Sequence, residues 1–521
     1  CPRLQAQPLI DHVPDNAIFY AGWQGSANLG EAYRQSHTHN IFNEPSVQRY
    51  LQQWVATFKT MAPQSDKDTQ ELNNFLAIVL NIKQHPSAVF ITKADAQDLV
   101  VLIAPPADQR AVLLKQLRDL DLSKDSPVSI AEVENLIVLQ FHSKDKSKDK
   151  PKPTAYTKPA SSLDNTPRFK QVMAQAKGRQ AALTGYLDLP AVLEVAKEDA
   201  PPDFTHVMSA TGAAGVQAIV FTFHFEDKQL VSQIFVDAPA PRQGLLSLLD
   251  DSRLTPEELS IVPGDALTVS AAKIDPARLL ETIRKVVDEV RPEQAGVVDQ
   301  GLMMGSMVTG VNLQEDFIKA LGPTWIMYTG PSLGSSILGS NIGLIGQVKD
   351  TPRMKQSLEL LKLFVQKQIA QYQEGNGISL PVTFQSVTYK GLELQSCYII
   401  FVAIHYTLAD DKLFISTTPD AIVAMVDAAR NRQNNITTTP AFTETFARMG
   451  SQAASTLQFH NIPEAAPRGY QMVMMMNQII TMGLSQEHEL DASATPVLPA
   501  MTTFLKHASA AGSALYVNDQ G

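Results

Sequence analysis

Residues 13–23 read VPDNAIFYAGW, and residues 262–272 read VPGDALTVSAA. Both stretches begin with Val-Pro, continue through turn-forming residues and end in an apolar run. Proline fixes φ, and Asp, Asn and Gly favour turns, so each stretch predicts a turn that leads into a strand. The second stretch starts about 250 residues after the first, which indicates two copies of one unit.

The repeat is found again further along each copy. TPRFKQVMAQAKGRQAALTGYLDLP begins at residue 166, and TPAFTETFARMGSQAASTLQFHNIP begins at residue 439. When the two stretches are aligned without gaps, Thr-Pro-x-Phe occurs at the same position in both. Further matches place Tyr186 on Phe459, Asp188 on Asn461, Leu189 on Ile462 and Pro190 on Pro463. These matches support a duplicated unit much longer than a short solenoid repeat.

Hydrophobic periodicity predicts the same order of elements in both copies. The first copy has an amphipathic helix at 45–61, a hairpin from 87–92 and 99–104, a helix at 108–120 and a strand at 134–141. The second has a helix at 275–290, a hairpin from 325–330 and 341–348, a helix at 351–372 and a strand at 411–417. We therefore expect an α+β fold in two tandem units, residues 13–261 and 262–521. In each, an antiparallel sheet carries amphipathic helices on one face.

The copies are expected to differ in two places. Residues 143–162 are rich in Lys and Pro and lack apolar periodicity, which predicts a solvated loop; the second copy has a helix at 418–431 instead. The first copy closes with two strands over 216–236, whereas the chain stops after GSALYVNDQG. A terminal strand without a return strand leaves an open edge, so we expect the second unit to be truncated at its C-terminus.

Composition excludes several classes of protein. The 521 residues are 44% hydrophobic and 18% charged, with a formal net charge of −10. This balance is typical of a folded chain and argues against a nucleic-acid-binding protein, which would present a basic face. No apolar stretch reaches the roughly 18–20 residues of a membrane helix. The best candidate, CYIIFVAIHYTL (397–408), is short and rich in β-branched residues, so it predicts a buried strand.

The N-terminus suggests export. Leu4-Gln5-Ala6 resembles the end of a signal peptide, with cleavage after Ala6. The alternative is lipidation of Cys1 as in a bacterial lipoprotein. Residues 1–12 are therefore expected to be a signal-peptide remnant or an N-terminal tether, and the protein to be secreted or periplasmic. Cys1 and Cys397 are the two cysteines, which excludes a disulfide framework.

One short motif suggests catalysis. GPSLG (330–334) matches the GxSxG nucleophile elbow, which would make Ser332 a nucleophile. That mechanism needs a strand-to-helix turn, but the following SLGSSILGSNIG is too rich in Gly and Ser to begin a helix. Downstream histidines are His405, His460, His488 and His507, and nothing in the sequence selects one. The stretch also lacks the GK[ST] of a P-loop and the GxGxxG of a dinucleotide site. We expect a hairpin loop and no catalytic or cofactor-binding residues.

Other clusters have simple structural explanations. His37 and His39 could bind a metal, but no further ligands complete a zinc site. Met-rich stretches at 301–310 and 469–484 could hold Cu(I) or present an adaptable partner surface, although helical core packing explains them directly. The second stretch places Met472, Met475, Met476, Ile479 and Ile480 on one helical face. Acidic pairs at 250–251, 257–258 and 410–411 lie at turns or helix starts, where carboxylates stay hydrated.

The VPxxA openings, GVNLQEDFIKALGPTWIMYTGP (310–331) and LADDKLFISTTPDAIVAMVDAA (408–429) together resemble a family of large secreted bacterial proteins. This family is known mainly from planctomycetes and is described only as a domain of unknown function. The resemblance covers most of the chain and implies export, but it provides no catalytic residues.

We therefore expect a non-catalytic exported protein with a structural or binding role in the cell envelope and an unknown protein or envelope partner. The alternatives are a periplasmic ligand-binding protein that uses the cleft between the repeats, near residues 186 and 459, and a serine hydrolase at Ser332. An interdomain cleft is a common pocket location. We expect no metal, no cofactor and no nucleic-acid partner.

Overall fold

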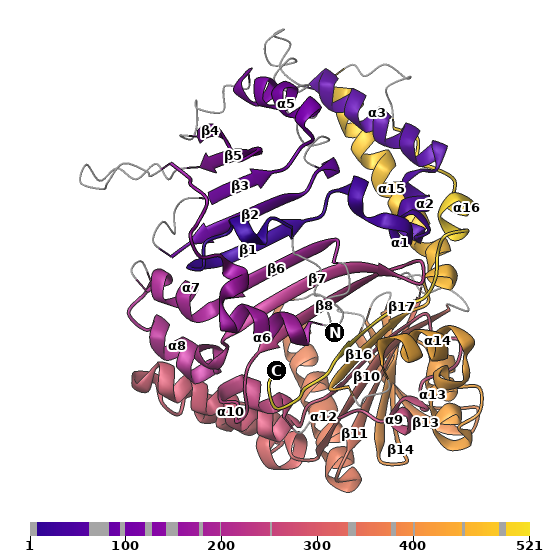
Figure 1. Ribbon diagram of the computed structural model, residues 1–521. Coiled ribbons are helices and arrows are strands. Elements are labelled where there is room, and N and C mark those ends of the chain that lie inside the picture. Colours follow the sequence, from indigo (N-terminus) through magenta and orange to yellow (C-terminus); the bar gives the residue numbers. More distant parts are fainter. Residues whose placement is uncertain are drawn as a thin grey trace.

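Two antiparallel sheets, each with its own helices, make up the computed structural model (Figure 1). The structure describes residues 8–61, 83–93, 99–119, 128–141, 155–176, 181–197, 200–250, 253–331, 340–376, 382–399, 402–450, 454–488 and 496–521. The expected α+β fold in two units is confirmed.

The first sheet has eight strands in the order β4-β5-β3-β2-β1-β6-β7-β8. Their bounds are β1 (Ala17–Trp23), β2 (Ser87–Thr92), β3 (Leu99–Ile103), β4 (Val128–Val133), β5 (Leu136–Phe141), β6 (Leu183–Asp188), β7 (Ala218–Glu226) and β8 (Gln229–Asp237). The opening strand β1 lies near the centre and pairs with β2 on one side and β6 on the other. The predicted hairpins β2–β3 and β7–β8 are confirmed.

The second sheet has nine strands in the order β12-β13-β14-β15-β11-β10-β9-β16-β17. Their bounds are β9 (Thr268–Lys273), β10 (Leu321–Pro331), β11 (Ser340–Val348), β12 (Val382–Tyr389), β13 (Leu392–Ile399), β14 (Val402–Ala409), β15 (Lys412–Ser416), β16 (Thr456–His460) and β17 (Ala511–Leu515). Here β9 takes the place of β1, between β10 and β16.

The strand orders match when β9 is set on β1. Then β10, β11, β15 and β14 correspond to β2, β3, β5 and β4, while β16 and β17 correspond to β6 and β7. The second sheet adds the hairpin β12–β13 at one edge, and no described strand takes the place of β8 beyond β17. The sequence repeat therefore corresponds to a repeat of topology.

The two openings are held by equivalent hydrogen bonds. Val13 and Val262 are fully buried. The Leu163 amide donates to the Val13 carbonyl at 2.9 Å, and the Ile436 amide donates to the Val262 carbonyl at the same distance. The next residue in each copy, Pro14 and Pro263, forms an isolated β-bridge, to Ser162 and Asn435 respectively. Each Val-Pro turn is thus bound to the segment that leads into the Thr-Pro helix.

Those Thr-Pro helices are α6 (Pro167–Gln175) and α14 (Pro440–Met449). Each inserts one phenylalanine, Phe169 or Phe442, into the core of its sheet. The Phe169 ring meets Tyr186 edge-on, and Phe442 meets Phe459 in the same way. A fully buried aromatic side chain contributes roughly 1.5–3 kcal/mol, so these contacts fix each helix on its sheet.

The predicted helices are present, with small shifts at their ends. They are α3 (Pro45–Met61), α5 (Ala107–Asp119), α10 (Pro276–Val290), α12 (Thr351–Asn376) and α13 (Pro419–Asn431). Asp275 caps α10, accepting from the amides of Ala277 and Arg278. Residues 155–162 of the Lys/Pro-rich segment form no helix, and Tyr156 packs against the first core. Residues 143–154 lie outside the described part of the chain.

Helices lie on both faces of each sheet, so the expectation of one covered face is wrong. Leu102 and Val138 join the core under α6, whereas their neighbours Ile103 and Ile137 pack against leucines of α5. Successive strand residues point to opposite faces. The continuous apolar run LIVLQF in β5 is buried on both sides for this reason. In the second unit, α13 and α12 contribute to two different clusters in the same way.

The predicted single buried strand at 397–408 is also wrong. These residues span the end of β13 and most of β14, which pair antiparallel. The apolar run therefore crosses a strand reversal. Tyr398, Ile399 and Ile404 are each more than a third exposed, so the run is not buried as a whole.

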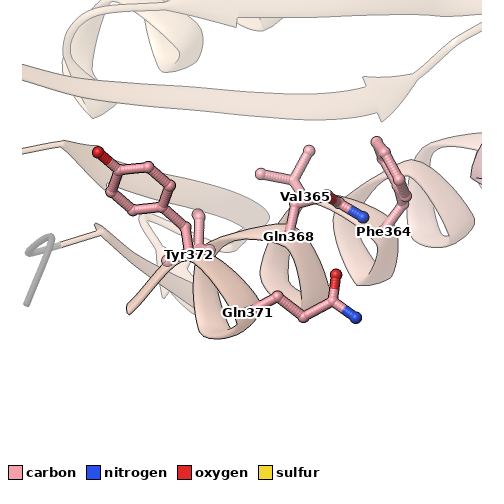
Figure 2. A pocket seen from close by; sticks show the side chains of 6 residues that line it. Phe364, Val365, Gln368, Gln371 and Tyr372 are labelled. Carbon is pink, nitrogen blue, oxygen red and sulfur yellow. The ribbon is translucent and has the colours of Figure 1, made fainter. Parts of the chain in front are cut away.

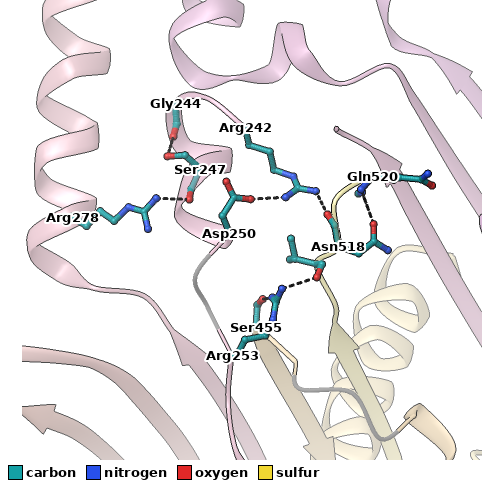
Figure 3. A network of polar contacts seen from close by, with 11 residues as sticks. Arg242, Gly244, Ser247, Asp250, Arg253, Arg278, Ser455, Asn518 and Gln520 are labelled. Atoms are coloured by element: carbon teal, nitrogen blue, oxygen red, sulfur yellow. Dashed lines mark hydrogen bonds and ion pairs between the residues drawn. The ribbon is translucent and has the colours of Figure 1, made fainter. Parts of the chain in front are cut away.

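The two units are joined by the C-terminal segment (Figure 3). The amides of Ala238 and Ala240, just after β8, donate to the carbonyls of Gln520 and Asp519. Arg242 binds both the Asp250 carboxylate and the Asn518 carbonyl. The end of the chain thus leaves β17 and lies on the first unit. A second joint places α8 (Phe204–Thr211) against α10.

Candidate interaction surface

The third joint is formed by α3 of the first unit and α15 (Ile462–His488) of the second, which lie side by side (Figure 1). The Tyr50 hydroxyl donates to Asn477 Oδ1 at 3.0 Å. Gln53 Oε1 accepts from the Val497 amide at 3.0 Å. These contacts are polar, although both helices are rich in apolar residues.

α15 begins at the position that the repeat predicts, but it is much longer than its counterpart in the first unit. In the first unit, α7 (Leu189–Ala196) follows β6 directly and has 8 residues. In the second, α15 follows β16 and has 27 residues. Only the beginning of α15 therefore lies where the duplicated fold provides a core, and the remainder extends beyond the sheet.

Most apolar side chains on this extension face solvent. Their exposed fractions lie between 42% and 66%, for Met472, Val473, Met474, Met475, Met476, Ile479, Ile480 and Met482. Residues 472–476 are consecutive, and residues on a helix are turned by about 100° from one to the next. The exposed apolar surface therefore extends around much of the helix.

The contacts that hold α15 come from its polar residues. Tyr470 donates to the Pro499 carbonyl, and the Asn477 amide donates to the Pro496 carbonyl. Tyr470, Asn477 and the half-buried Thr481 are spaced i, i+7 and i+11, which places them on one stripe. This stripe faces α3 and residues 496–499. An ordinary surface helix buries its apolar stripe; α15 turns its polar stripe inward instead.

The prediction that Met472, Met475, Met476, Ile479 and Ile480 fill a core is therefore wrong. The helical spacing was correct, but the spacing does not say which face turns inward. The other Met-rich stretch behaves similarly: in α11 (Val297–Thr309), Met303, Met304 and Met307 are all more than half exposed. We call the exposed residues of α15 between 472 and 482, with Leu51 and Val55 of α3, the apolar helix surface.

Ser332 lies outside the described residues, and GPSLG begins at the end of β10. That strand pairs with β11 as the predicted hairpin. Arg468, near the start of α15, donates to the Gly330 carbonyl at 3.2 Å.

The downstream histidines have separate surroundings. His405 is buried in β14 and its Nδ1 lies 2.7 Å from the Ser396 hydroxyl. Burial lowers the pKa of His405. His460 ends β16, His507 contacts Glu44 at 2.7 Å, and the side chain of His488 is outside the described part. Neither of these contacts sets a described histidine between a serine hydroxyl and a carboxylate, as a triad requires.

The other candidate groups are also placed. His37 and His39 lie in α2 (His37–Phe42), where the His39 ring packs edge-on against Tyr33. Within the described residues, no three His, Cys, Asp or Glu side chains are grouped closely enough to hold a metal. No described helix combines the length and apolar character of a membrane span.

Four members of the acidic pairs bind neighbouring side chains. Glu258 binds Lys273 and the Thr324 hydroxyl. Asp410 pairs with Arg430. Asp411 accepts from the Thr351 hydroxyl. Asp250 binds Arg242, and residue 251 is not described.

Tyr186 and Phe459 do not line a cleft, since both are almost fully buried in the cores of their own units. A shallow hollow of about 510 Å³ runs along one side of α12 (Figure 2). It is lined by Phe364, Val365, Gln368, Ile369, Gln371 and Tyr372. A second hollow, about 380 Å³, lies between α5 and Glu132 of β4. Neither lies between the units.

The structure contains a polar cluster that the sequence did not predict. Beneath α6, Arg168 binds Asp188 Oδ2 at 2.8 Å, and the Tyr186 hydroxyl donates to the same oxygen at 3.3 Å. Asp188 lies opposite Ala218, which lies opposite Asp237. Both carboxyls therefore point to the same face of the sheet, with their Cα atoms about 10 Å apart.

Asp237 is the unusual member of this cluster. It is 4% exposed, and its Oδ1 has no hydrogen-bond partner. Burial raises the pKa of the Asp237 carboxyl, an effect that the nearby Arg168 guanidinium opposes. The second unit has Phe459 and Asn461 where the first has Tyr186 and Asp188. This difference between the two copies could have identified Tyr186 and Asp188 as a special pair. No feature of the sequence identifies Asp237.

Comparison with protein-family models, with curated proteins and with solved structures gives no match for this chain.

Proposed function

We propose that this chain is a non-catalytic exported protein of the cell envelope that binds a protein partner through the apolar helix surface. The observation that carries the proposal is the inverted orientation of α15, whose polar stripe is half-buried against α3 and residues 496–499 and whose methionines are exposed. Large exposed apolar patches mark interaction sites. Methionine surfaces adapt to partners of different shape.

The chemistry of the surface favours a protein over a lipid bilayer. No charged residue occurs between Arg468 and Glu487, so the surface lacks the Lys and Arg that bind anionic headgroups. The net charge of −10 also opposes approach to an anionic membrane. An amphipathic helix of another protein, docking by its apolar face, is the partner that fits. Export and a lipid anchor at Cys1 remain predictions from the N-terminal sequence.

The proposal is tested by site-specific photocrosslinking. A photoreactive residue replaces Met475 on α15 in cells that express the full chain. A matched control carries it at Val112, an isolated exposed apolar residue of α5 (58% exposed). We expect position 475, and not position 112, to give an adduct with one protein.

Binding must then be reproduced with purified proteins. Because a central apolar contact is replaced by a charge, Met475→Glu with Ile479→Glu is expected to weaken the complex by about tenfold or more. The same crosslinks from both positions, or unchanged affinity in the double variant, would contradict the proposal.

A further inference from the structure

The second sheet ends at β12, and the outer edge of this strand has no partner strand among the described residues. At the opposite edge of the same sheet, β17 leads into the segment that lies on the first unit. The β13 and β14 end of the sheet accordingly lies on the side away from the first unit (Figure 1). The hairpin β12–β13 has no counterpart in the first sheet, so the duplicated topology does not require this edge.

The sequence of β12 lacks the features that normally keep sheet edges apart. Natural outer strands carry charged side chains or proline, or are very short. β12 has eight residues, VTFQSVTY, with no charge and no proline. The other outer strands differ from it, since β4 contains Glu132, β8 ends in Asp237 and β17 has only five residues. Of the four outer strands, β12 therefore opposes pairing with another strand least.

The backbone groups of β12 point outward at every second residue. Lys390 and Gly391 form a two-residue turn between β12 and β13, and both have positive φ. The residues that flank such a turn are hydrogen-bonded to each other, so Tyr389 and every second residue before it bond to β13. The residues that turn their N–H and C=O groups outward are Val382, Phe384, Ser386 and Thr388.

The helix α12 lies over one face of this edge. Lys362 of α12 donates to Gln395 of β13 at 2.9 Å, and the Gln395 amide donates to the Ser386 hydroxyl of β12 at 3.0 Å. Alternate residues of a strand share a face, so Phe384 lies on the same side as Ser386. α12 therefore covers the face of the hairpin that carries Phe384.

Beyond Lys362, the side of α12 that faces the sheet is apolar and incompletely covered. Val365, Ile369 and Tyr372 follow Lys362 at helical spacing and line the hollow of about 510 Å³. Val365 is 39% exposed and Tyr372 is 50% exposed. Figure 2 shows these two side chains turned to the same side of the helix. Apolar area is thus available on the same face as the outer edge of β12.

We propose that β12 pairs antiparallel with β12 of a second copy of this chain, which joins two nine-stranded sheets across a two-fold axis. A two-fold axis normal to the sheet keeps each face of the strand on the same side in both copies. With the axis at Gln385, outward N–H groups lie opposite outward C=O groups. Thr383 then meets Val387 of the second copy, and Phe384 meets Ser386. A net charge of −10 does not oppose this contact, because β12 carries none of it.

The size of the contact sets its strength. An eight-residue strand spans only about 27 Å, so backbone pairing alone falls short of the roughly 1,200–2,000 Å² that a stable interface buries. The exposed side chains of α12 add apolar area from both copies on one face of the junction. We therefore expect a dimer of micromolar affinity. The inference concerns β12 and α12 and does not rest on the proposed role of the apolar helix surface.

Sedimentation equilibrium of the full chain tests the dimer, and charge variants test where it forms. Between about 1 and about 100 µM, the average mass should rise from one chain towards two. Gln385 is exposed and lies on the axis. Gln385→Lys alone, or Gln385→Glu alone, sets like charges opposite each other and should weaken the dimer by about tenfold or more. An equal mixture of the two variants sets opposite charges together and should restore a mixed dimer, which misfolded variants could not form.

Two controls complete the experiment. Gln458→Lys places the same charge at an exposed position of the inner strand β16 and should leave the dimer intact. Met475→Glu with Ile479→Glu should also leave it intact, so this inference and the proposed function can fail separately. A wild-type chain that stays monomeric at about 100 µM would overturn the inference. So would a dimer that persists in both Gln385 variants, or a mixture of them that stays monomeric.

Discussion

At the scale of single residues, Asp237 is the group whose surroundings fit its chemistry least. A carboxyl that is 4% exposed has one oxygen without a hydrogen-bond partner. Leaving a buried polar group unsatisfied costs about 1–3 kcal/mol. Its folded-state pKa is raised. Its contribution to stability is therefore complete below the unfolded pKa and is lost as the pH rises through the folded pKa.

Asp237→Asn is accordingly expected to increase the free energy of unfolding at neutral pH by about 1 kcal/mol, because the amide is never charged. At acidic pH, where the wild-type carboxyl is protonated, the difference should shrink. Urea unfolding of both proteins at the two pH values measures it. Asp15→Asn, at an exposed aspartate, is the matched control and should change little at either pH. A less stable Asp237→Asn protein at neutral pH would show that the charge is needed.

At the scale of secondary structure, the sequence predicted which segments are helices and strands better than how they are buried. The start of α3 was predicted to the residue, because Pro45 marks it and the apolar spacing that follows is regular. In α15 the periodicity was also present. The orientation of α15 depends on contacts with Tyr50 and with residues 496–499. Neither lies in the aligned repeat segment that contains the start of α15.

Replacing a methionine by alanine should cost more stability where the side chain is buried, in α13, than where it is exposed, in α15. Met425 in α13 is fully buried, so Met425→Ala is expected to cost about 2–5 kcal/mol of unfolding free energy. Met475 in α15 is 52% exposed, and Met475→Ala should cost no more than about 0.5 kcal/mol. Denaturant unfolding measures both. Similar costs for the two variants would mean that α15 is covered, which would remove the basis of the apolar helix surface.

At the scale of the whole molecule, the duplication was predictable and the joints between the copies were not. Val-Pro and Thr-Pro-x-Phe recur because each copy needs the same turn and the same aromatic contact to begin its sheet and fix its helix. The joints use Glu44, Arg242 and Asn518. These side chains serve contacts between the units, so they have no counterpart in the repeat and no pattern that identifies them.

Both units are built on one turn-and-bridge arrangement, and two backbone amides report on it directly. The Leu163 amide donates to Val13, and the Ile436 amide donates to Val262. Both acceptors are fully buried. Residue-resolved hydrogen exchange of the full chain should show both amides protected to the level of the core strands, because each opens only when its unit opens. Exchange of either amide at the rate of an exposed loop would show that its unit is not built on this arrangement.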